Sequence, residues 1–144
     1  MKSLEFDKKI KELQQLHPIW FKLLDSRPAT IDEFRELEKK MNVKLPFEYE
    51  HIVTTYGGGY FAFSILYSVL DESDYNIYSI NEENKILAKG YILFSENQVG
   101  DFYGFKIKDN IVQSKIYFYD HEIAIWKETK YHNLYDFLYE NMKH

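Results

Sequence analysis

Cysteine is absent from the 144 residues. This excludes disulfides, cysteine-bound zinc, iron–sulfur clusters and thiol catalysis, and it fits a reducing compartment without proving one. The length suits one domain, and a chain of this size buries enough surface to fold without a covalent or metal staple. We therefore expect a single domain over residues 1–144.

Long apolar runs are also missing. No segment reaches the ~20 apolar residues that a membrane-spanning helix needs. The first nine residues mix both charges and lack the apolar core of a signal peptide. These features predict a cytoplasmic protein without a membrane partner.

Positive charge is scarce where negative charge is concentrated. The formal net charge is −5, which disfavours nucleic acid as a partner because a phosphate backbone binds a basic face. Residues 45–84 contain no lysine or arginine and seven acids, whereas residues 1–44 have a net charge of +2 and residues 85–144 of zero. Five of these acids lie close together: Asp71, Glu72, Asp74, Glu82 and Glu83. They form either a solvated loop or an electrostatic landing patch for a basic partner.

Aromatic residues are plentiful, at 18% with 13 tyrosines, so the chain is not disordered as a whole. Tyr67, Tyr75 and Tyr78 interleave with the acids. Tyrosine is frequent in interfaces because it combines rigid apolar area with a polar tip, although packing in the core explains any one of them equally well. We predict these three tyrosines and the five acids as partner-binding residues.

The first third of the chain has helical periodicity. Residues 4–24 predict a helix that Pro18 bends or restarts. Thr30 and Glu33 match a capping box at the start of a second helix that ends at Asn42. A third helix is expected from Leu45-Pro46 to the glycines at 57–59.

The second half has the shorter period of strands. Asp109-Asn110 favours a turn between two strands, and Asn133 is a candidate cap for a final helix. Helices followed by a run of strands predict an α+β fold, with N-terminal helices packed on an antiparallel β-meander and a C-terminal helix. The expected strands are 60–66, 91–94, 101–108, 115–119 and 123–126.

Motifs for catalysis or metal binding are absent. The glycines at 57–59 follow a helix and precede no Lys-Ser/Thr, so they form neither a P-loop nor a dinucleotide fingerprint. His121, between Asp120 and Glu122, is the best candidate for a metal or acid–base role, but a polar turn explains it more simply. We expect no enzyme, no cofactor, no metal site and no catalytic residue.

Several short motifs together resemble the SMI1/KNR4 (SUKH) superfamily. Leu45-Pro46-Phe47-Glu48-Tyr49, followed by the glycines at 57–59, is similar to its Leu-Pro-x-x-Tyr…Gly-Gly signature. Gly100-Asp101-Phe102-Tyr103 resembles its Gly-Asp-x-Tyr strand, and residues 119–122 match a family turn. The similarity covers roughly residues 30–140, with Met41-Asn42 where the family often has Leu-Gly.

The resemblance implies a protein-binding function without catalysis. Bacterial members look like immunity proteins that bind the C-terminal domain of a cognate toxin, and eukaryotic members resemble regulatory scaffolds. We therefore expect an immunity protein that stoichiometrically occludes a toxin domain such as a nuclease, with a regulatory or scaffolding domain as the alternative. The shared motif makes Asp101 a structural residue that holds the turn before its strand.

Overall fold

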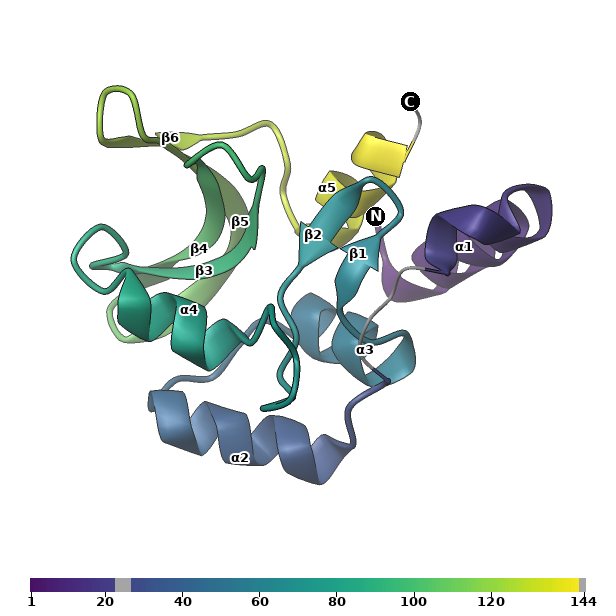
Figure 1. Ribbon diagram of the computed structural model, residues 1–144, viewed down its shortest axis with the longest axis horizontal. Helices are drawn as coiled ribbons and strands as arrows, with labels where there is room; N and C mark the ends of the chain where they lie inside the picture. The colour runs from purple at the N-terminus through teal and green to yellow at the C-terminus, as the bar shows by residue number, and fades with distance from the viewer. Residues whose placement is uncertain (23–26, 143–144) are drawn as a thin grey trace.

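The computed structural model describes residues 1–22 and 27–142, and it has the expected α+β architecture. Helices come first, an antiparallel four-stranded sheet follows, and a helix closes the fold (Figure 1). The elements are α1 (Ser3–Leu16), the 3-10 helix η1 (Pro18–Phe21), α2 (Ile31–Met41), α3 (Phe47–Thr55), β1 (Gly59–Phe61), β2 (Ser64–Leu66), α4 (Ile77–Glu83), β3 (Tyr91–Glu96), β4 (Phe102–Lys108), β5 (Ile111–Asp120), β6 (Ile125–Glu128) and α5 (Leu134–Met142).

The ends of α2 are fixed by local sequence, as predicted. The Thr30 hydroxyl accepts the Glu33 backbone N–H at 3.1 Å, and the Glu33 carboxylate accepts the Thr30 backbone N–H at 2.9 Å. This confirms the capping box. Asn42 adopts the left-handed conformation with φ of 54°, and it ends the helix in place of the glycine that is common there.

The first helix is shorter than the expected 4–24. It ends at Leu16, and Pro18 starts the separate turn η1 because proline has no N–H for the helical ladder. The end of the expected helix, residues 23 and 24, lies outside the described residues.

The glycines at 57–59 lead from α3 into the first strand. Gly57 and Gly59 have positive φ, near 100°, which favours glycine. Gly58 is needed for a different reason, since a Cβ there would lie 2.9 Å from the Cα of Ser68. The buried face of α3 is formed by Tyr49, Ile52 and Val53.

Residues 60–66 form a hairpin rather than one strand. β1 and β2 pair with each other around a turn in which Ala62 has φ of 54°. The alternation of aromatic and β-branched residues hid this turn because it contains no glycine or asparagine. The hairpin adjoins the main sheet, where the Tyr67 backbone N–H donates to the Phe94 carbonyl at 2.9 Å.

The main sheet is the expected meander, in the order β3-β4-β5-β6. Asp109 and Asn110 both have positive φ, at 52° and 65°, and they make the predicted turn between β4 and β5. Phe94 and Phe105 stack on the inner face of the sheet at 4.5 Å between ring centroids. The buried core includes five residues of the last helix: Leu134, Tyr135, Phe137, Leu138 and Met142.

The acidic stretch contains a helix, α4, where a solvated loop was one expectation. The Asn76 side chain caps it by accepting the Ser79 N–H at 2.9 Å. Buried Asn81 then bonds both the N–H and the carbonyl of Leu93, at 2.8 and 3.0 Å, which fixes α4 against β3. α2 lies on the other side of α4 from the sheet (Figure 1). None of the described helices is long and apolar enough to cross a bilayer.

Candidate functional site: an acidic groove

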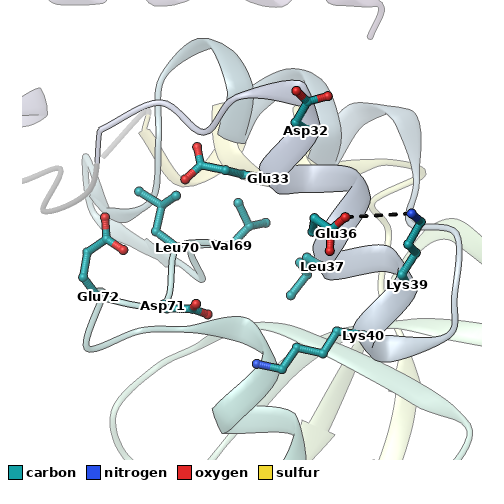
Figure 2. A pocket seen from close by; sticks show the side chains of 10 residues that line it. All are labelled: Asp32, Glu33, Glu36, Leu37, Lys39, Lys40, Val69, Leu70, Asp71 and Glu72. Atoms are coloured by element: carbon teal, nitrogen blue, oxygen red, sulfur yellow. Dashed lines mark ion pairs between the residues drawn. The ribbon is translucent and has the colours of Figure 1, made fainter.

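A groove of about 650 Å³ lies between α2 and the segment 69–72 that precedes α4. Its floor is apolar, formed by the buried side chains of Leu37, Val69 and Leu70. Its walls bear acids from both segments, and Figure 2 shows Asp71 pointing into the groove from the wall opposite α2. The polar lining comprises Asp32, Glu33, Glu36, Lys39, Lys40, Asp71 and Glu72.

Arg27 spans one end of the groove. Its guanidinium makes two bonds to the Glu33 carboxylate, at 2.6 and 2.8 Å, and lies 3.9 Å from Glu72 on the facing wall. The bonds from Arg27, followed by the Thr30 backbone N–H, lower the pKa of Glu33 to about 2. Glu33 is therefore ionised throughout the physiological range.

The other end of the groove is closed by Lys40. Its ammonium lies 4.0 Å from the ring centroid of Tyr78 on α4, a cation–π contact that joins α2 to α4. Lys39 lies 3.8 Å from Glu36, but both side chains are more than three-quarters exposed, so this pair contributes little.

Two acids of the groove have no cation partner in the described chain. Asp32 and Asp71 stand on opposite walls, and no described Lys, Arg or His lies within ion-pair distance of either. The groove therefore keeps an excess of negative charge over an apolar floor. Such a surface attracts a cationic group and can pack its aliphatic part.

Comparison with known proteins identifies the family of the chain. The model of the SMI1-KNR4 cell-wall family matches residues 31–138, three-quarters of the chain. The protein belongs to the SMI1-KNR4 family. No curated protein matches its sequence. Both walls of the groove lie inside the family match, whereas Arg27 lies before it.

The predicted acids of this SMI1-KNR4 member divide into two sets. Asp71 and Glu72 line the groove. Asp74, Glu82 and Glu83 are exposed outside it, and Glu82 borders a smaller hollow of about 190 Å³ beside β3. Asp71 and Glu72 therefore share a hollow with the acids of α2, whereas the other three acids of this stretch do not line it.

The α2 acids of the groove were missed because residues 1–44 have a net positive charge. Their signal was nevertheless present. Asp32, Glu33 and Glu36 have helical spacing, which places them near one another at the start of α2. The facing wall could not be inferred, because it comes from a segment more than thirty residues further on.

The three predicted tyrosines also differ in placement. Tyr67 is fully buried and donates its hydroxyl to Glu96 at 2.9 Å, so it supports the core and offers no surface to a partner. Tyr75 is half-buried, and its hydroxyl lies 3.2 Å from that of Tyr60, a contact that raises the pKa of Tyr75 to about 12. Tyr78 is half-buried at the Lys40 end of the groove.

His121 lies in a cluster with Asp101 and Asp120, whose potential ligand atoms are within 4.8 Å of one another. Asp101 accepts the backbone N–H of His121 at 2.9 Å and bonds its ring Nδ1 at 2.6 Å. Asp120 pairs with Lys127 at 3.3 Å. The contacts of His121 with Asp101 match the structural role expected of Asp101.

A second histidine cluster was not anticipated. The ring of His51 on α3 bonds Asp7 of α1 at 3.0 Å and the hydroxyl of Tyr135 on α5 at 2.7 Å. Burial raises the pKa of Tyr135, so its hydroxyl is less readily ionised than an ordinary tyrosine. The arrangement favours a structural hydrogen-bond network that links three helices over a site with an activated nucleophile.

Proposed function

We propose that the protein is an immunity protein that binds a cognate toxin domain and neutralises it by stoichiometric occlusion. The observation that carries this proposal is the acidic groove, whose facing walls hold two unpaired carboxylates in a member of the SMI1-KNR4 family. The groove and the adjacent exposed acids of the segment 71–83 form the contact surface.

The surface has the chemistry that such a partner requires. Toxin domains that cleave nucleic acid carry basic faces for phosphate, and acids spread over two walls imitate that phosphate charge. Exposed ion pairs contribute only ~0.2–1 kcal/mol each, so the charges mainly accelerate encounter. Affinity would come from a few partly buried anchors, of which Tyr78 is the best placed beside the groove.

Co-purification from the native cells tests the proposal. The protein is immobilised, the column is washed at low and then at high salt, and the bound proteins are identified by mass spectrometry. The expected result is a salt-resistant partner with a variable C-terminal domain. That domain, expressed alone, should be toxic, and co-expression of this protein should restore growth.

The alternative is a regulatory or scaffolding domain, and it is favoured by the cell wall in the family's description. It predicts a partner without toxicity that elutes as the salt concentration rises. The same column separates the two functions, because the immunity protein should retain its partner under those conditions.

A further inference from the structure

We propose that the acidic groove is a receptor for arginine side chains, and that Arg27, which contacts the wall carboxylates of Glu33 and Glu72 without lining the groove itself, competes with the arginines of a partner. The identity of the partner rests on the proposed function. The chemistry of the groove does not, because it can be tested with a peptide alone.

The contacts of Arg27 indicate what the groove binds. Its planar guanidinium donates two hydrogen bonds to the Glu33 carboxylate, at 2.6 and 2.8 Å, and the Glu72 carboxylate on the opposite wall lies 3.9 Å away. A guanidinium matches a carboxylate in this two-bond geometry, whereas an ammonium acts as a point charge. The Arg27 side chain is 53% exposed, so a partner's guanidinium can replace it without unfolding the groove.

The remainder of the groove has room for further cations. Asp32 and Asp71 lie on facing walls and have no cation partner among the described residues. Below them, Leu37 and Leu70 provide an apolar floor on which the methylene stem of an arginine can pack. The volume, about 650 Å³, lies within the usual range of ligand sites.

The spacing of the carboxylates favours a segment with several cations over a single metal ion. Within the described residues, the only group of three or more acids and histidines that could converge on one ion is the Asp101–His121 cluster, far along the sequence from both walls. The groove acids are spread along two walls instead. A protein segment that carries several arginines would match them one by one.

The test uses a short fluorescein-labelled peptide with several arginines, and the same peptide with lysine at each arginine position. Fluorescence anisotropy at low salt measures both dissociation constants. The proposal predicts tighter binding of the arginine peptide. Equal binding of the two peptides would overturn it, because the groove would then attract any positive charge.

Variants of Arg27 give the most specific prediction. Arg27→Gln should tighten binding of the arginine peptide by about two- to fivefold, since it frees Glu33 and Glu72. Lys11→Gln makes the same charge change on the exposed surface of α1 and should have no effect. Arg27→Lys retains the charge but removes the guanidinium and its two hydrogen bonds to Glu33, so it should also tighten binding of the arginine peptide. Unchanged or weaker binding by both Arg27 variants would show that Arg27 is not a competitor.

The walls are tested by two matched double variants. The double variant Asp32→Asn with Asp71→Asn should weaken binding of the arginine peptide by roughly five- to tenfold. Glu5→Gln with Glu12→Gln removes the same charge from the exposed surface of α1, which contributes no residue to the groove, and should leave the dissociation constant unchanged. An equal loss of peptide affinity in the two double variants would mean that the net charge of the protein alone attracts the peptide, which contradicts the proposal. Circular dichroism confirms that each variant is folded.

The peptide results and the toxin results can fail separately. If the peptide behaves as predicted but no toxin domain binds, the groove chemistry stands and the immunity function is wrong. If a toxin domain binds but Arg27→Gln and the wall variants do not alter peptide affinity, the immunity function stands and the arginine receptor is wrong.

Discussion

His121 holds Asp101 through both its backbone and its ring. The backbone N–H donates to the Asp101 carboxylate at 2.9 Å, and the ring Nδ1 lies 2.6 Å from the same oxygen. The backbone bond, followed by the ring and the amide of Asn97, lowers the pKa of Asp101 to about 2. The bond with Asp101 raises the pKa of His121. The pair fastens the start of β4 to the end of β5.

Asp101→Ala should therefore lower the melting temperature by a few degrees and leave partner binding intact. The Asp101 contribution is complete above its ordinary pKa of 3.8 and is lost as the pH falls toward about 2. The His121 contribution is complete below 6.5 and is lost as the pH rises through its raised pKa. Thermal unfolding should show a larger loss at pH 5 than at pH 9. An equal loss at both would mean that the ion pair adds nothing.

Thr30→Ala should destabilise the protein by about 1 kcal/mol because it removes the cap of α2. Thr30→Ser is the matched control, since serine keeps the capping oxygen. Urea unfolding followed by circular dichroism measures both. If the two variants unfold at the same urea concentration, the capping box does not contribute to stability.

Tyr67→Phe should reduce stability by about 1 kcal/mol, because the buried ring stays and only the bond to Glu96 is lost. Its affinity for a partner should equal that of the wild type. Tyr78→Ala should instead weaken the complex, by about 2 kcal/mol if this ring is an anchor. Calorimetric titration of both variants with the partner measures the two affinities. Weaker binding by Tyr67→Phe would mean that this core residue takes part in partner recognition.

Asp71→Lys with Asp74→Lys should slow association with the partner at low salt, and the difference should shrink as salt is added. The same reversal at Glu5 and Glu12 is the comparison, because these exposed acids of α1 belong neither to the groove nor to the segment 71–83. Stopped-flow mixing gives the association rate constants. An unchanged association rate constant for the Asp71 and Asp74 variant would mean that these acids are only solvated surface and do not attract the partner.

The sequence predicted those parts of the fold that depend on neighbouring residues. The capping box at Thr30, the left-handed Asn42 and the turn at Asp109-Asn110 all act within a few residues, and each is present. The helix α4 was missed because its start depends on a single cap, Asn76, and its packing on the distant contact between Asn81 and β3.

The candidate site was predicted only in part, for the same reason. Asp71 and Glu72 were found from local charge, but their role depends on the facing wall of α2. Charge counted along the chain cannot show this pairing, because the acids at the start of α2 are outweighed in the sum by the cations of residues 1–44. For Tyr67 the sequence left a binding role and packing in the core open, because its burial depends on the distant strand β3 and on Glu96.

Occlusion of a toxin domain by direct contact can be measured by isothermal titration of the purified protein with the toxin domain recovered from its native cells. We expect a 1:1 complex that persists at high salt, abolishes toxicity, and is weakened by Asp32→Asn with Asp71→Asn. A toxin domain that remains active and unbound at saturating concentrations of this protein would show that the protein does not act by occlusion.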